Sequence, residues 1–149
     1  MNSKRYKVFI VELFILSIIL MALITIITAL SMETRKQSIE AGRLTDAVLC
    51  AENTAEMTSE AASVKQAAKM IGKMDNVSEP GVSGNVISAK TQILTEKGES
   101  RVYIVKVTID VEKGSSGRYI KKKIEVFSGD DAEKIYELDT GNYIGRDAA

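Results

Sequence analysis

The chain has 149 residues, and its twenty basic and twenty acidic side chains give a formal net charge of zero. It contains no histidine and only one cysteine, which excludes histidine-based acid–base catalysis, Ser-His-Asp and Cys-His arrangements, cysteine or histidine zinc clusters and an internal disulfide framework. The balanced charge gives no global attraction toward nucleic acid or anionic lipid. We therefore expect a protein that is not an enzyme and that needs no cofactor, metal or small-molecule substrate.

Residues 8–32 form an apolar run in which Glu12 is the only charged residue. The twenty residues from Leu13 to Met32 carry no charge, and in a helix they span roughly 30 Å, the thickness of the hydrocarbon core of a bilayer. A single segment in lipid has to satisfy its own backbone hydrogen bonds, so it has to be helical. The run predicts a transmembrane helix over 8–32, with the lipid bilayer as a partner.

The flanking residues predict the orientation of this helix. The leader, residues 1–7, carries Lys4, Arg5 and Lys7, and the positive-inside rule keeps such an end in the cytoplasm. Everything after Met32 is then extracytoplasmic. A cleaved secretory signal is the alternative, because Ala29-Leu30-Ser31 loosely fits a small-x-small cleavage site. The apolar run exceeds a signal's usual core by about ten residues, which favours a single-pass anchor in the cell membrane.

Glu12 has two physically sound explanations. An ionised carboxylate about one turn inside an apolar boundary is costly unless it finds a positive partner. That partner is either Lys7 or Arg5 at the interface, or a cation that another subunit supplies. Composition does not separate the two.

Residues 33–74 are predicted to be an extracytoplasmic helical spine, because they are rich in good helix formers. One continuous helix through Met74 is the simplest expectation, and a separate amphipathic helix after a kink near Gly42 is the alternative. Apolar residues recur at helical spacing, which predicts a packing seam. The seam consists of Leu44, Val48, Ala51 and Ala55, followed with a phase shift by Ala61, Val64, Ala68 and Ile71.

A head of antiparallel β-structure follows a loop at residues 75–85. Residues 105–111 alternate apolar and polar side chains, which indicates a half-buried strand. Residues 119–127 form the returning strand, residues 86–95 an earlier strand, and residues 135–138 a last short one. Residues 86–149 therefore predict a meander of three or four strands. A small sheet needs a cover for its apolar face, so the fold class is α+β, with the outer half of the long helix packed on the sheet.

Three smaller features are expected to have structural roles only. Cys50 is expected to be a buried thiol that packs as a small hydrophobe. The run Lys121-Lys122-Lys123 is expected on the exposed face of a strand, where lysines discourage edge pairing, and nucleic acid is not an expected partner. The acidic residues Asp130, Asp131, Glu133 and Asp139 match no calcium loop, so a metal site is not expected.

Together these features resemble the type IV pilins and the pseudopilins of type II secretion. The segment Val8-Phe9-Ile10-Val11-Glu12-Leu13 is similar to the aromatic-x-x-x-Glu-Leu start of a mature pilin, with Val8 as its first residue. Residues 44–52 also look like the spine of small pilin-like proteins from Gram-positive bacteria.

The resemblance implies a function for the N-terminal helix. Glu12 would meet the free terminal amine of a neighbouring pilin-like subunit and set the register of an assembly, with Val8 and Phe9 beside it. The family's peptidase cuts after glycine, whereas Lys7 precedes Val8 and no glycine precedes Gly42. The resemblance therefore implies either a divergent, processed minor subunit or an unprocessed one. The alternative is a bitopic envelope or cell-division scaffold that uses its outer helix to bind a partner.

Overall fold

The computed structural model describes residues 3–95, 98–114, 117–129 and 133–145. These residues form two helices, α1 (Ser3–Met57) and α2 (Val64–Ile71), and five strands. The strands are β1 (Gly81–Ser83), β2 (Val86–Leu94), β3 (Ser100–Lys113), β4 (Gly117–Ser128) and β5 (Lys134–Gly145). The chain divides into two compact units, Met1–Ala41 and Gly42–Ala149. The second unit, which contains the end of α1 and all the β-structure, is called the head below.

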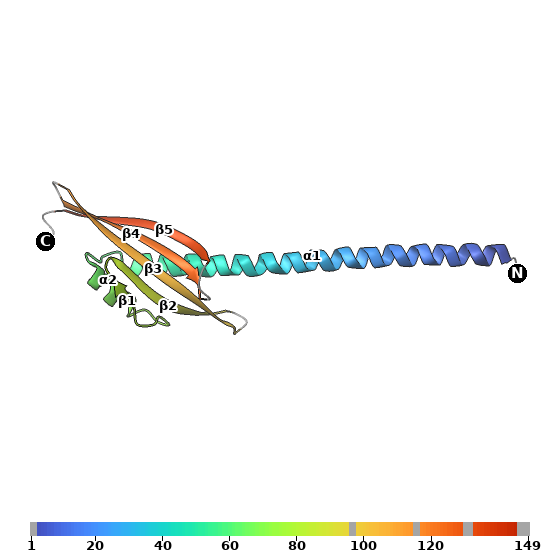
Figure 1. Cartoon of the computed structure of the whole chain (residues 1–149), viewed down its shortest axis with the longest axis horizontal. Coiled ribbons are helices and arrows are strands. Elements are labelled where there is room, and N and C mark those ends of the chain that lie inside the picture. The colour runs from blue at the N-terminus through green and yellow to red at the C-terminus, as the bar shows by residue number, and fades with distance from the viewer. Residues whose placement is uncertain (1–2, 96–97, 115–116, 130–132, 146–149) are drawn as a thin grey trace. The chain divides into compact units, whose positions relative to one another are not determined.

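The predicted fold class is confirmed, because a long N-terminal helix packs on an antiparallel sheet (Figure 1). The sheet has five strands in the order β1-β2-β3-β4-β5, and each neighbouring pair is antiparallel. Every connection is therefore between adjacent strands, as in a simple meander. The three strands with the clearest signal, at 86–95, 105–111 and 119–127, correspond to β2, β3 and β4.

Two parts of the β-structure differ from the prediction. The expected loop at 75–85 contains β1, and Val77 makes an isolated bridge to Thr91 of β2. β1 has only three residues, so it is too short to show an alternating pattern. The last strand extends to Gly145 rather than ending at Leu138. Its second half contains Gly141, which weakens a strand signal in the sequence.

The expectation of one helix through Met74 is wrong. α1 ends at Met57, and α2 begins at Val64 after a turn. Ser63 is the N-cap of α2, with an extended backbone and a side-chain oxygen that accepts a hydrogen bond from the Gln66 amide. Serine is a preferred N-cap because its oxygen satisfies an amide that has no partner within the helix. Gly42, the alternative site for a break, lies within α1.

The core of the head lies between one face of the sheet and the two helices. Buried and exposed side chains alternate along β3 and β4, so one face of each strand is turned to the core. The sheet contributes large branched side chains, whereas the helices contribute mostly small ones, and small side chains let a helix approach a sheet closely. The core consists of Ile87, Ala89, Tyr103, Val105, Val107, Ile109, Ile120, Ile124 and Val126 from the sheet, and Ala47, Cys50, Ala51, Ala61, Ala67, Ala68 and Ile71 from the helices and the turn between them.

Candidate membrane span and contact surfaces of the head

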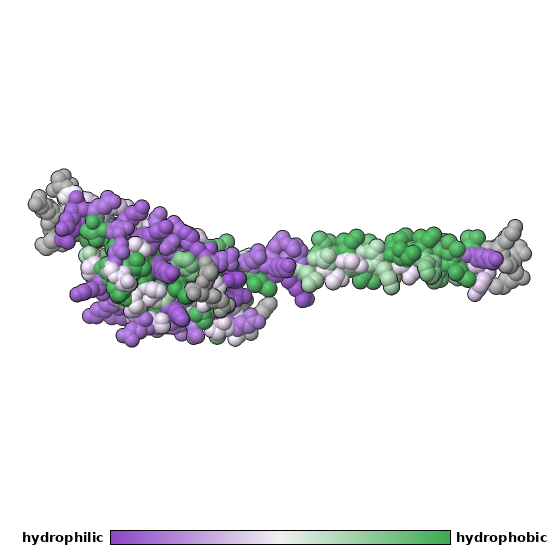
Figure 2. All heavy atoms as spheres, viewed as in Figure 1, coloured by the Kyte–Doolittle hydropathy of each residue, from purple (hydrophilic) through white to green (hydrophobic). Residues whose placement is uncertain are grey.

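The apolar run of α1 has no packing partner within its own unit. Every large apolar side chain from Val8 to Met32 is between 45% exposed, at Ile10, and 70% exposed, at Met21. Figure 2 shows this run as an almost unbroken hydrophobic stretch. Among the described residues, one helix is long and apolar enough to cross a membrane, and it contains this run. In water such a surface would be costly at about 25 cal/mol per Å².

Hydroxyl groups inside the run are satisfied by the helix itself. The Thr25 hydroxyl donates to the Met21 carbonyl at 2.9 Å, and the Thr28 hydroxyl donates to the Ile24 carbonyl at 2.8 Å. Ser31 makes the same bond to the Ile27 carbonyl at 2.9 Å. These side chains therefore need no water, which suits a helix surrounded by lipid.

The residues that the pilin resemblance assigns to assembly lie on the surface of this helix. Val8 is 67% exposed and Phe9 59% exposed, and Glu12 is also exposed. Among the ion pairs of the described side chains, none includes Glu12 or Lys7. The two are five positions apart, outside the three- or four-residue spacing that brings helical side chains together. The side chain of Arg5, the other expected partner, lies outside the described residues.

The packed face of α1 is rotated relative to the predicted seam. Ala51 is fully buried as predicted, and Val48 and Ala55 are half-buried. Leu44 is 47% exposed, so its expected place in the seam is wrong. The buried stripe instead consists of Ala47, Cys50, Ala51, Thr54 and Thr58. The second half of the seam is confirmed, although it lies on α2 and the preceding turn: Ala61, Ala68 and Ile71 are buried, and Val64 packs against them.

The seam predicted from the spacing of apolar residues differs from the buried stripe because two residues of the stripe are threonines. Thr54 and Thr58 are almost completely buried. Their hydroxyls donate to the carbonyls of Cys50 and Thr54, each at 2.7 Å. A threonine bonded in this way presents its methyl group to the core, so it packs like an apolar residue while it counts as polar in the sequence.

A half-buried polar cluster joins α1 to β3. Asp46 accepts hydrogen bonds from Arg101 at 3.2 Å and from the Tyr103 hydroxyl at 3.0 Å. Burial raises the pKa of Tyr103, and the neighbouring Asp46 carboxylate raises it further. A second link runs from Arg43 to the Ser128 hydroxyl at 3.0 Å. These contacts fix the rotation of the last turns of α1 against the sheet.

Lys122 corrects the expectation that all three consecutive lysines are exposed. Its side chain is 1% exposed, and its ammonium group donates to the carbonyls of Thr58 and Ser59. Asn142 of β5 also donates to the Ser59 carbonyl. The carbonyls at a helix C-terminus have no partner within the helix and carry partial negative charge, so Lys122 and Asn142 cap the end of α1. Burial lowers the pKa of Lys122.

The opposite face of the sheet carries mixed charge. Lys123 pairs with Glu137 at 3.0 Å, and Lys134 pairs with Glu125 at 3.3 Å. The pKa of Glu137 is lowered, first by its hydrogen bond from Lys134. Within the expected basic run, Lys123 is therefore paired with acidic neighbours. No metal-type cluster of acidic or sulfur side chains occurs in the described ranges; Asp130 and Asp131 lie outside them.

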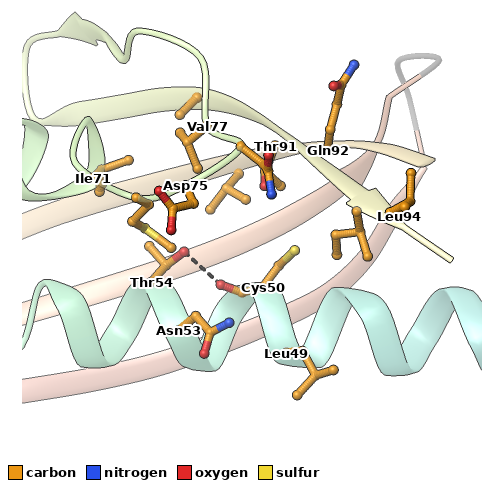
Figure 3. A pocket seen from close by; sticks show the side chains of 15 residues that line it. Leu49, Cys50, Asn53, Thr54, Ile71, Asp75, Val77, Thr91, Gln92 and Leu94 are labelled. Carbon is orange, nitrogen blue, oxygen red and sulfur yellow. Dashed lines mark hydrogen bonds between the residues drawn. The ribbon is translucent and has the colours of Figure 1, made fainter. Parts of the chain in front are cut away.

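A groove of about 430 Å³ lies between α1, the segment after α2, and β2 (Figure 3). It is lined mainly by apolar side chains, including Leu49, Ile71 and Val77, and Cys50 lies at its base on α1. Cys50 is buried, as expected, at 8% exposure. Asp75 is the only carboxylate in the lining. The lining therefore offers no pair of groups for acid–base or nucleophilic chemistry.

Comparison with known proteins gives no relative: no family model, no curated protein and no solved structure matches this chain.

Proposed function

We propose that this protein is a non-enzymatic, membrane-anchored structural subunit of a pilin-like assembly, such as a type IV pilus, a competence pilus or a type II secretion-like machine. One observation carries the proposal. The helical run 8–32 is apolar and exposed on all sides, and it contains a single carboxylate, Glu12. The basic leader places the N-terminus in the cytoplasm and the head outside.

In this proposal subunits associate by lateral packing of their apolar helices. Packing alone specifies register weakly, because many sliding positions bury similar apolar surface. A positive group from a neighbouring subunit would neutralise a carboxylate at one depth in the membrane. Every other register would leave a charge without a partner in the apolar region, which costs free energy. Glu12 would therefore select one register.

A second candidate, a bitopic envelope scaffold, is supported by the outer part of α1. Leu44 is 47% exposed and Leu49 is 50% exposed, so the head leaves two leucines of this helix uncovered. A partner helix could cover them. In that case Glu12 contributes nothing to association.

Substitution of Glu12 separates the two candidates. A photo-crosslinking amino acid at Leu16 reports contacts between helices in native membranes. We expect crosslinked oligomers from the wild type and from the control Glu33→Leu, whose carboxylate lies just beyond the run. Glu12→Leu should insert equally well but lose the single register, so the yield of crosslinked oligomers at Leu16 should fall. Equal crosslinking by Glu12→Leu would refute the register proposal.

The state of the N-terminus separates the two forms of the pilin proposal. Mass spectrometry of the terminal peptide from native membranes identifies the first residue. A start at Val8 or Phe9 would identify a subunit processed at an unusual site, whereas an intact leader through Lys7 would identify a permanently anchored relative. A start at Met32 would contradict the anchor, because the apolar run would then be a cleaved signal.

A further inference from the structure

Two tetrapeptides of the same pattern lie side by side at one end of the sheet. β4 begins with Gly117-Arg118-Tyr119-Ile120, and β5 contains Gly141-Asn142-Tyr143-Ile144 just before its last residue, Gly145. The strands are antiparallel, and Tyr119 lies directly opposite Tyr143. The two copies of the Gly-x-Tyr-Ile pattern therefore lie next to each other on adjacent antiparallel strands. A local two-fold axis between Tyr119 and Tyr143 relates one copy to the other.

Both tyrosines lie on the face of the sheet that the helices do not cover. Ile120 is buried and its strand alternates, so Tyr119 points to the opposite face. Tyr119 is 43% exposed and Tyr143 is 59% exposed. They are the two most exposed aromatic side chains of the head.

The rings lie down against the sheet rather than standing away from it. A Cβ atom added to Gly117 would lie 2.6 Å from the Tyr143 hydroxyl, and one added to Gly141 would overlap the hydroxyl end of the Tyr119 ring. Each ring thus extends diagonally over the glycine of the other copy. Glycine is needed there because any side chain would lift the ring. The result is a pair of adjacent aromatic rings that extend along the exposed face of the sheet, here called the tyrosine platform.

We propose that the tyrosine platform binds a neutral, unbranched oligosaccharide. The face of an aromatic ring carries partial negative charge, and it attracts the weakly positive C–H groups on one face of a sugar ring. Two adjacent rings on a flat sheet offer consecutive stacking positions to an extended chain. The platform lies wholly within the head, so this ligand site is independent of the membrane proposal.

The charges around the platform favour a neutral ligand over a nucleic acid. Glu112 lies opposite Tyr119 on β3, and Asp110 lies opposite Lys121, the next residue on the exposed face of β4. Asp110 also accepts a hydrogen bond from Asn85 at 2.8 Å. Single-stranded nucleic acid needs a positively charged groove beside its stacking residues, whereas the charges beside the platform are mixed and two of the three are acidic. The same carboxylates and Lys121 can exchange hydrogen bonds with sugar hydroxyls.

Binding of defined hexasaccharides to the full chain in detergent micelles tests this proposal. Cellohexaose, chitohexaose, laminarihexaose and maltohexaose are the neutral probes, and oligothymidylate is the anionic probe. We expect saturable binding of at least one hexasaccharide by the wild type and by Tyr119→Phe/Tyr143→Phe. Each ring removed should weaken binding roughly fivefold to tenfold.

The controls distinguish recognition from stability. Tyr119→Leu/Tyr143→Leu keeps an apolar side chain at each position but has no aromatic face, so it should keep the thermal midpoint of the head and lose binding. Gly141→Ala keeps both rings but lifts Tyr119 from the sheet, so it should weaken binding without unfolding the head. The proposal is overturned if no hexasaccharide binds, if the leucine variant binds as well as the wild type, or if only oligothymidylate binds.

Discussion

The helix α1 carries two kinds of apolar surface, and their difference distinguishes a candidate membrane span from a helix face that packs in a domain core. Residues 8–32 are apolar on all sides, consist mainly of large side chains, and are exposed throughout. Residues 47–58 bury only a narrow stripe of Ala, Cys and Thr. A surface that meets lipid has to be apolar all round. A surface that meets a sheet needs only one small-residue face, and its other faces remain polar.

The largest effect is expected from a charge placed in the narrow stripe. Ala51 is fully buried against the sheet, so Ala51→Arg adds both volume and an unpaired charge to the core. We expect the free energy of unfolding of the head to fall by more than about 4 kcal/mol. Thermal or chemical denaturation should then show no cooperative unfolding transition. Glu52→Arg, one residue further and exposed, is the matched control. If Ala51→Arg denatures like the wild type but loses a partner, the stripe is a binding interface and the scaffold candidate is correct.

The same charge in the apolar run should leave the head intact and impair insertion instead. Ile19 lies near the middle of 8–32 and is 50% exposed. Ile19→Arg should cost about 3 kcal/mol of insertion free energy, measured as the fraction of chains that resist alkaline extraction from membranes. Met32→Arg, at the end of the run, should cost much less because the side chain reaches the interface. An unchanged inserted fraction for Ile19→Arg would contradict a bilayer-spanning run.

The cap at the end of α1 should give a smaller effect that is confined to the head. Lys122→Met removes one of the two donors to the Thr58 carbonyl, the other being the Ala61 amide, and one of the two donors to the Ser59 carbonyl. We expect a loss of about 2 kcal/mol in the free energy of unfolding, measured by denaturant titration. Lys121→Met, on the exposed face of the same strand, should have little effect. Equal effects of the two substitutions would show that the buried cap contributes nothing specific.

The smallest effect is a pH dependence from the same side chain. Burial lowers the pKa of Lys122 below its ordinary value of 10.5, so the folded head releases this proton at a lower pH than the unfolded chain does. In the interval below 10.5 the unfolded state binds more protons, and this group makes the free energy of unfolding rise with pH. The stability advantage of the wild type over Lys122→Met should therefore grow as the pH rises through that interval. An advantage that shrinks instead would contradict burial as the main cause of the shift.

The sequence predicts the elements whose pattern is local and strong. The apolar run is long and almost uninterrupted, and the segments at 105–111 and 119–127 alternate; each matches an element of the structure. The end of α1 was missed because distant residues determine it. Lys122 and Asn142 cap the helix from strands more than sixty residues away, and no helix-stop signal marks Met57.

The surfaces of the head were predicted less well, for two physical reasons. Leu44 suggested a seam that is rotated from the buried stripe, because Thr54 and Thr58 pack as apolar residues once their hydroxyls are bonded to the helix. The repeated Gly-x-Tyr-Ile pattern is visible in the sequence, but it becomes a platform only when the register of β4 and β5 places Tyr119 opposite Tyr143.

The most direct test of the central claim is the labelling of Glu99→Cys by a membrane-impermeant maleimide in intact cells. Glu99 is an exposed residue between β2 and β3, whereas the native Cys50 is buried, so the wild type is the unlabelled control. A head anchored outside the membrane predicts labelling in intact cells, with all labelled protein retained in the membrane pellet after an alkaline wash. Labelling only after lysis, or labelled protein in the medium, would contradict the account.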